Sequence, residues 1–200
     1  MALPKLAAPK FALDIPSTGK RIMFRPFLVK EEKALLMAAQ SEDTIDMIDA
    51  VKDVISACVQ DDAFDVEKIP YFDMEYIFLN IRAKSISEVV KLEYRHTGGV
   101  NYQGIACDAV TPVEINLENV KVQHNPEHNN KIQLDDKLGL EMRYPTINDV
   151  RMVSDGADEI EMLAKCIVSV YDEDSVYEPD NLEDSIEFIE SLNNEQFTKI

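Results

Sequence analysis

The sequence has no apolar run that approaches the roughly 20 residues needed to cross a bilayer, and its N-terminus lacks the pattern of a signal peptide. The short apolar stretch at residues 1–13 is interrupted by Pro4 and Lys5, which disfavours a cleavable secretory leader. We therefore expect a protein that is made and used in a reducing cytoplasm, with no membrane insertion.

Cysteine is scarce and odd in number. The chain has three cysteines, Cys58, Cys107 and Cys166, widely spaced and in apolar settings. An odd number of scattered cysteines does not make a disulfide framework, so all three are expected to be buried free thiols.

The short motifs of nucleotide sites and nucleophilic enzymes are missing as well. A P-loop needs G-x-x-x-x-G-K followed by Ser or Thr, with a helix that begins at the lysine. The stretch 17–20 has a single glycine, Gly19, and Arg21 follows Lys20, so it predicts a tight turn with Gly19 at positive φ. No G-x-S-x-G elbow is present, and we expect a non-enzyme with no catalytic residues and no cofactor.

Potential zinc ligands do occur between residues 96 and 128. They are His96, Cys107, His124 and His128. A His-x3-His spacing is a strong zinc signal only on a helix, and Pro126 stands between the last two histidines without any Cys-x2-Cys pair nearby. We expect no metal site, and a metal-dependent enzyme that uses this region is kept as an alternative.

Acidic residues outnumber Lys and Arg by 38 to 20, which gives a net charge of −18. Direct binding to nucleic acid or to an anionic membrane needs a cationic face, so this balance argues against both. The charge is uneven, because residues 1–33 hold seven Lys/Arg against three acids, whereas residues 171–190 hold nine acids and no Lys or Arg. The acidic segment is either a solvated face or a patch that docks a basic partner. An acidic decoy that captures a nucleic-acid-binding protein is a further alternative.

The hydrophobic pattern predicts an α+β fold without βαβ alternation. Residues 11–14 and 21–24 flank the turn and predict an N-terminal β-hairpin. A bundle of three helices is expected next: one from Lys30 that packs Leu35, Leu36 and Ala39 inward, one capped by Asp43, and one capped by Asp73.

Residues 88–145 switch to period-two alternation and predict a central antiparallel sheet with one wet face. C-terminal helices follow, one with an apolar stripe over residues 160–171 and one capped by Asp180. We expect residues 1–87 and 146–200 to pack into one composite unit, with residues 88–145 as a β insert.

Aromatic and arginine side chains are dense for a chain without catalytic motifs. Arg25-Pro26-Phe27 follows the hairpin, and such a hairpin can bind a partner by strand addition or can pack on the helices. The candidate partner-binding residues are Lys20, Arg21, Arg25, Phe27, Asp172, Glu173 and Asp174.

Longer stretches resemble a known family. In order along most of the chain they are PSTGKRIMFRPFLVKEEK, FDMEYIFLNIRAKS, LEMRYP and SLNNEQFTKI. They resemble the baseplate proteins of T4-like contractile-tailed bacteriophages, and among these the family that takes part in assembling the baseplate hub. The resemblance implies a late, non-enzymatic structural protein or assembly chaperone that binds other hub or tail subunits, in the host cytoplasm during assembly or in the virion baseplate.

The resemblance also bears on the C-terminus. Residues 193–200 begin a helix that stops after one turn and leaves Phe197 and Ile200 as an apolar stub. The resemblance implies a family pattern that continues beyond this point, which would account for the stub; the sequence leaves open whether the chain is truncated at Ile200.

Overall fold

The computed structural model describes residues 7–96, 99, 109–123, 125–126, 128–154, 156 and 158–200. Its helices are α1 (Val29–Ser41), α2 (Thr44–Cys58), α3 (Tyr71–Ser85), the short 3-10 turn η1 (Leu117–Asn119), α4 (Ile147–Ser154), α5 (Glu159–Lys165), α6 (Leu182–Glu190) and α7 (Asn194–Phe197). Its strands are β1 (Phe11–Asp14), β2 (Arg21–Phe24), β3 (Val89–Arg95), β4 (Val110–Asn116), β5 (Lys131–Gln133), β6 (Gly139–Met142), β7 (Ile167–Tyr171) and β8 (Val176–Tyr177). Helices and antiparallel sheets are segregated along the chain, which confirms the predicted α+β class.

The N-terminal hairpin forms where the sequence predicts it. β1 and β2 pair antiparallel with Phe11 opposite Phe24, and Gly19 in the turn has φ +66. Most residues avoid that left-handed conformation, so the turn depends on glycine at this position.

Asp73 does not cap α3, so that part of the prediction is wrong. The helix begins at Tyr71 after Pro70, which places Asp73 inside the first turn. Its fully buried carboxylate accepts hydrogen bonds from the backbone N–H of Ser17, at 3.1 Å, and from the Ser17 hydroxyl. The side chain therefore fastens the hairpin turn onto α3.

The helices around α3 follow the prediction for α2 more closely than for α1. Asp43 caps α2 by accepting from the N–H of Ile45 at 2.8 Å, as predicted. In α1 only Leu35 packs against the core, whereas Leu36 is 58% exposed and Ala39 also faces solvent. The inward placement of Leu36 and Ala39 is wrong, because α1 packs mainly against α2 and these two side chains lie on its solvent-exposed side.

The antiparallel pairing predicted for residues 88–145 is confirmed, but the strands divide between two sheets. Among the described strands, β3 and β4 pair only with each other, and β5 and β6 join β7 and β8 in a four-stranded sheet ordered β5-β6-β7-β8. The sequence predicted a helix that extends to Tyr171, but the helix ends at Lys165, so that part of the prediction is wrong. Residues 167–171 are rich in β-branched residues and fill the position between β6 and β8.

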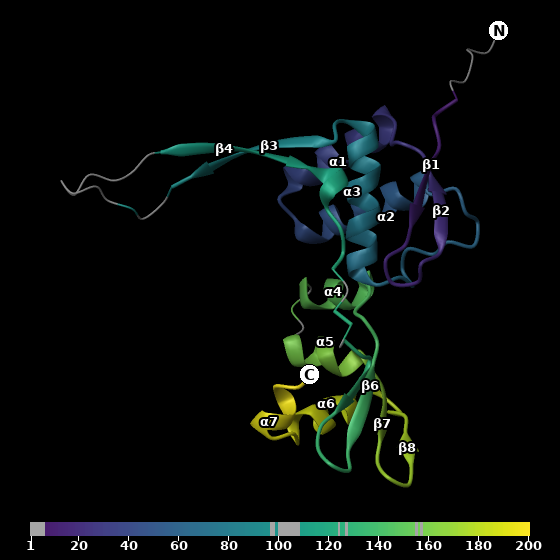
Figure 1. Cartoon of the computed structure of the whole chain (residues 1–200), viewed down its shortest axis with the longest axis vertical. Helices are drawn as coiled ribbons and strands as arrows, with labels where there is room; N and C mark the ends of the chain where they lie inside the picture. Colours follow the sequence, from purple (N-terminus) through teal and green to yellow (C-terminus); the bar gives the residue numbers. More distant parts are fainter. Residues whose placement is uncertain are drawn as a thin grey trace.

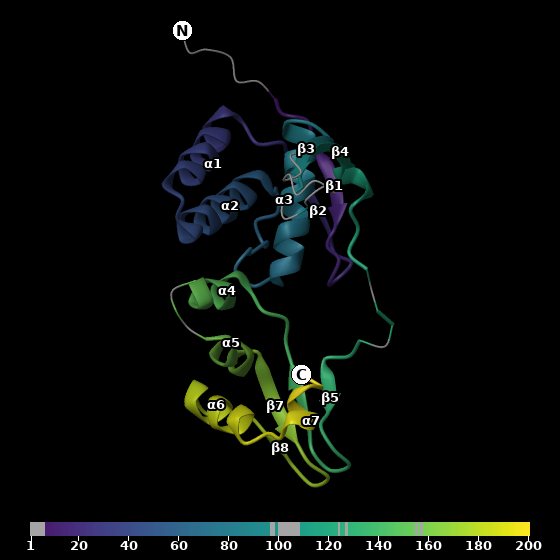
Figure 2. The same ribbon diagram turned by 90° about the vertical axis from the view of Figure 1, so that its left-hand side faces the viewer.

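Figure 1 shows an elongated molecule with the hairpin and α1–α3 at one end and the four-stranded sheet with α5–α7 at the other. The β3–β4 ribbon projects sideways from the first end, and the view turned by 90° in Figure 2 shows it nearly end-on. We call this ribbon the arm. The division at residues 87/88 and 145/146 stays a prediction.

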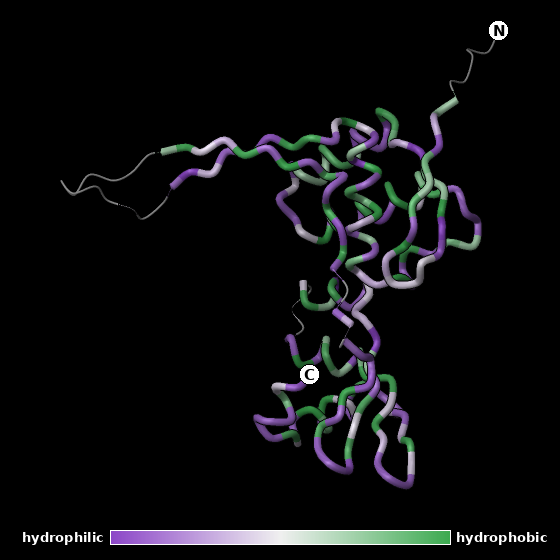
Figure 3. Tube along the Cα trace, viewed as in Figure 1, coloured by the Kyte–Doolittle hydropathy of each residue, from purple (hydrophilic) through white to green (hydrophobic). Residues whose placement is uncertain are grey.

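Two hydrophobic cores correspond to the two ends. The first gathers buried residues of the hairpin, α2 and α3, together with Ile147 of α4. The second lies between the four-stranded sheet and α5–α6 and contains Leu134, Leu140 and Ile189. The hydropathy colouring in Figure 3 shows apolar and polar residues alternating along the arm, outside both cores. The helix predicted to be capped by Asp180 is α6, and its cap is Asn181, so that part of the prediction is wrong.

The two cores meet at the segment between β6 and α4. Arg143 donates to Asp149 through Nη1 (2.6 Å) and Nη2 (3.1 Å), and Nη2 also donates to the carbonyl of Lys165 at 2.9 Å. Asp149 accepts in addition from the N–H (2.7 Å) and hydroxyl (2.8 Å) of Thr146. Burial raises the pKa of Asp149, but the hydrogen bonds from Arg143 and Thr146 outweigh burial and leave that pKa below its ordinary value.

Asp149→Ala is expected to lower the free energy of unfolding by about 2–3 kcal/mol, because it leaves Arg143 and Thr146 without their buried acceptor. Since the pKa of Asp149 is lower in the folded than in the unfolded chain, its contribution is present above about pH 4 and is lost as the pH falls through the folded value. Urea titrations at a series of pH values measure both effects. The control is Asp49→Ala, which removes a half-exposed ion pair to Arg151 of 2.7 Å and should cost less than about 1 kcal/mol. If Asp149→Ala and Asp49→Ala lowered the free energy of unfolding equally, the burial of Asp149 would not explain its contribution to stability.

Candidate functional site

The two most exposed candidate cations lie on the hairpin and are paired within the chain. Lys20 is 2.8 Å from Asp61. Arg21 donates to both oxygens of Asp14, its cross-strand partner, at 2.7 and 2.9 Å, and this hydrogen bonding lowers the pKa of Asp14. Both cations remain accessible to solvent, so a partner could compete for them.

Arg25 and Phe27 contact the core of the chain itself. The Nη2 of Arg25 donates to Glu31 at 2.9 Å, and the other carboxylate oxygen of Glu31 accepts from the N–H of Leu28 at 2.8 Å. Burial raises the pKa of Glu31, but these hydrogen bonds outweigh it and lower the pKa overall. Phe27 is 8% exposed, and its N–H donates to the Ser85 hydroxyl at 2.9 Å. A further role of Arg25 and Phe27 in partner binding stays a prediction.

The acidic candidates form the turn between β7 and β8. Asp172 accepts from the N–H groups of Asp174 (2.9 Å) and Ser175 (2.8 Å) and from the Tyr177 hydroxyl (3.0 Å), and these bonds lower its pKa. Glu173 and Asp174 are exposed. This turn and the basic hairpin lie at opposite ends of the molecule in Figure 1, so the structure does not bring the candidates into a single site.

The potential metal ligands are dispersed as far as the structure describes them. His96 follows β3 on the arm, whereas His128 stacks on Tyr144 with ring centroids 5.5 Å apart; Cys107 and His124 lie outside the described residues. Within the described ranges, no three His, Cys, Asp or Glu side chains are grouped so as to hold a metal ion. In the same ranges no helix is long and apolar enough to cross a bilayer.

The two described cysteines are buried free thiols, as predicted. Burial raises the pKa of the Cys58 thiol to about 11, and it raises the pKa of Cys166 as well. A thiol with a raised pKa is a poor nucleophile at neutral pH, because the thiolate is the reactive form.

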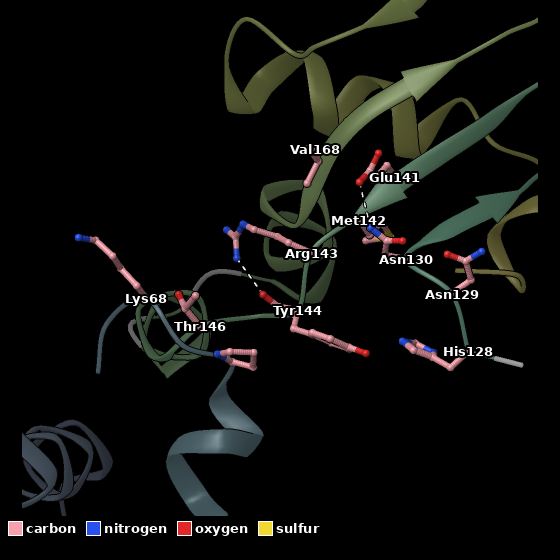
Figure 4. A pocket seen from close by; sticks show the side chains of 11 residues that line it. Lys68, His128, Asn129, Asn130, Glu141, Met142, Arg143, Tyr144, Thr146 and Val168 are labelled. Carbon is pink, nitrogen blue, oxygen red and sulfur yellow. Dashed lines mark hydrogen bonds between the residues drawn. The ribbon is translucent and has the colours of Figure 1, made fainter. Parts of the chain in front are cut away.

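A groove of about 530 Å³ lies beside the segment that joins the two cores (Figure 4). The charged side chains that line it are already paired within the chain: Lys68 with Asp65, Arg143 with Asp149, and Glu141 with the amide of Asn130. Its aromatic wall is Tyr144, which contacts Phe72 edge-on at a centroid distance of 5.0 Å. These pairings suit a structural role better than chemistry on a substrate.

The arm has one face of mostly apolar side chains. The sequence predicted the alternation that creates this face, but not its position in the fold. The apolar face of the arm consists of Val90, Leu92, Tyr94, Thr111, Val113 and Ile115, which are paired across the ribbon. Tyr94 is 59% and Leu92 38% exposed, whereas a core sheet would bury this face. On the opposite face Lys91 is 3.1 Å from Glu114. The alternation predicted one solvent-exposed face. In the isolated chain, much of the apolar face is also exposed to solvent.

The family model described as T4 bacteriophage base plate protein matches residues 8–200. The chain belongs to this family. No curated protein and no solved structure matches the chain. As a T4 base plate protein, the chain has a structural role in a bacteriophage tail, and that role implies contact with other tail proteins, either in the virion or while the tail is assembled.

In this base plate protein, the candidate residues of the hairpin should differ sharply in their effect on folding. Phe27→Ala should lower the free energy of unfolding by about 3 kcal/mol or more, because it empties a buried site. Lys20→Ala and Arg21→Ala should each lower the free energy of unfolding far less, because their ion pairs are exposed to solvent. Chemical denaturation of the three variants measures this, and a loss below about 1 kcal/mol for Phe27→Ala would contradict the burial of its ring.

Proposed function

We propose that the chain acts in the assembly of the baseplate hub by binding other hub or tail subunits, without catalysing a reaction. The family supports the phage tail context, and the resemblance of its longest stretches to hub proteins supports the hub. The observation that carries the proposal is the arm, a two-stranded ribbon whose apolar face is exposed.

The physical argument starts from the stability of the ribbon. An isolated two-stranded hairpin is marginal in water, and a third strand or a packed partner is needed for independent stability. The pairing of β3 with β4 satisfies the backbone groups on the inner edges of the arm, but it leaves Leu92 and Tyr94 exposed. Covering such side chains gains roughly 25 cal/mol for each Å² of apolar surface removed from water. A partner subunit on this face would therefore stabilise both the contact and the arm.

The two edges of the ribbon differ as sites for strand addition. Proline in a paired strand is tolerated where its missing N–H faces away from the neighbouring strand, and Pro112 lies in β4 opposite Glu93. The outer edge of β4 thus lacks one donor, which leaves the outer edge of β3 as the better template for a partner strand.

The proposal covers both a permanent baseplate subunit and a transient assembly chaperone. Mass spectrometry of mature particles compared with assembly intermediates separates the two, because a chaperone leaves before maturation.

The double variant Leu92→Gln/Tyr94→Gln should reduce the recovery of other tail proteins with the tagged chain from infected cells by about tenfold or more, because it removes two apolar contacts of the arm. Quantitative mass spectrometry of the purified complexes measures the recovery. The matched control is Lys91→Gln/Glu93→Gln, which introduces the same residues on the same strand but on the opposite face. Circular dichroism verifies that both variants fold.

Two results would count against the proposal. If the wild-type chain recovers no tail proteins, its role in hub assembly is wrong. If both double variants recover them equally, the apolar face of the arm is not the contact.

A further inference from the structure

A second surface is a groove lined by residues of β7, β8 and α6 and of the segment between β8 and α6. These elements lie at the end of the molecule away from the hairpin and α1–α3 (Figure 2). The groove has a volume of about 300 Å³, and its apolar lining is Ile167, Val170, Tyr177, Pro179 and Phe188. Ile167 belongs to the second core, and Val170 and Phe188 pack against it. The groove is therefore an opening onto packed side chains of the core, and its floor is fixed by that packing.

The wall formed by Tyr177 is held in place by a specific contact. Its hydroxyl donates to Asp172 at 3.0 Å, and Asp172 is itself held by the N–H groups of Asp174 and Ser175. Tyr177 is nevertheless 55% exposed. The ring thus presents a positioned apolar surface to solvent beside the groove.

The rim of the groove carries one sign of charge. Glu178, Asp180 and Asp184 line it, and the sequence from Cys166 to Thr198 contains ten acids and no Lys, Arg or His. Within the described part of the chain, none of these ten acids forms an ion pair; the paired acids all lie between Asp14 and Asp149. The groove therefore combines an apolar floor with a rim of unneutralised carboxylates.

The apolar floor and the acidic rim together favour a partner with complementary charge. An apolar side chain fits the floor, and cations on either side of it suit the rim. A second copy of this chain fits poorly, because each copy carries −18 and three cations of its basic end, Lys20, Arg21 and Arg25, are already paired. Nucleic acid is repelled by the same rim. The partner that fits is a different protein with a short basic segment.

We propose that this groove binds a basic segment of another tail protein, with an apolar side chain of that segment against Val170, Tyr177 and Phe188 and with flanking Lys or Arg side chains paired to Glu178, Asp180 and Asp184. The identity of the partner as a tail protein rests on the proposed function, whereas the chemistry of the groove does not.

A synthetic peptide with one Leu between two pairs of Lys tests the groove directly, with the same peptide carrying Gly for Leu as its reference. In NMR titrations of the whole chain, the Leu peptide should shift the amide signals of Val170, Tyr177 and Phe188 and bind about fivefold or more tightly than the Gly peptide, because only Leu uses the floor. Equal binding of the two peptides, or shifts confined to other acidic segments, would overturn the proposal in favour of diffuse charge attraction.

Matched variants of the rim test the charges. Glu178→Gln/Asp180→Asn/Asp184→Asn should weaken binding of the Leu peptide about tenfold, on the basis of three exposed ion pairs lost. The control Glu183→Gln/Glu187→Gln/Glu190→Gln removes the same charge from exposed positions of the same segment and should weaken binding less than about threefold. Equal weakening by both triple variants would overturn the assignment of the rim.

The same variants separate this inference from the proposed function. Suppose that the wild-type chain recovers tail proteins from infected cells and that the rim variant recovers all of them as well as the control variant does. The proposed binding of a tail protein at the groove is then wrong, and the proposed function stands. When the chain recovers no tail proteins but the Leu peptide binds the groove as described, the groove chemistry stands and the proposed function is wrong.

Discussion

The carboxylate of Asp149 is the point at which the two ends of the molecule depend on each other. It is 1% exposed and accepts from Arg143 at the end of β6 and from Thr146 at the start of α4. Through Arg143 it reaches the carbonyl of Lys165, where α5 passes into β7. Ile147, between Thr146 and Asp149, inserts into the first core. One buried acceptor thus fixes the entry to α4 relative to the sheet, and a buried acceptor tolerates little variation in the geometry of its donors.

Charge is also distributed unevenly between the two ends of the molecule. The acids that form ion pairs in the described residues lie in the first three quarters of the chain, where Lys and Arg are interleaved with them. Beyond Cys166 the acids stand without cations until Lys199. Residues 166–200, with ten acids and one Lys, therefore carry half of the net charge of −18. A concentrated field of this kind steers an oppositely charged partner and weakens with added salt.

The turn at Gly19 and the cap at Asp43 were predicted correctly from local sequence signals, although the cap of α6 was placed one residue too early. Contacts between distant segments were not predicted. The turn at Gly19 and the cap at Asp43 depend on residues within a few positions of each other, so they are encoded locally. Asp73 resembles a cap by its place before an apolar run, yet its partner is Ser17, 56 residues away. Residues 160–171 keep helical spacing throughout, but pairing with β6 and β8 makes the last five of them a strand. The arm and the groove were out of reach for the same reason, because exposure of an apolar face depends on what the rest of the chain leaves uncovered.

The two proposed contact surfaces differ in the forces they would use. The apolar face of the arm would bind by burial, which is short-ranged and changes little with salt. The groove would add charge attraction, which acts at longer range and raises the rate of encounter more than the final affinity. A basic partner would be attracted to the groove from a distance, whereas a partner of the arm would be held only once the two surfaces are in close contact. Because the Asp149 junction links the two ends, two partners held in this way would be fixed in their relative orientation. Orientation of subunits is what assembly requires, and it needs no catalytic group.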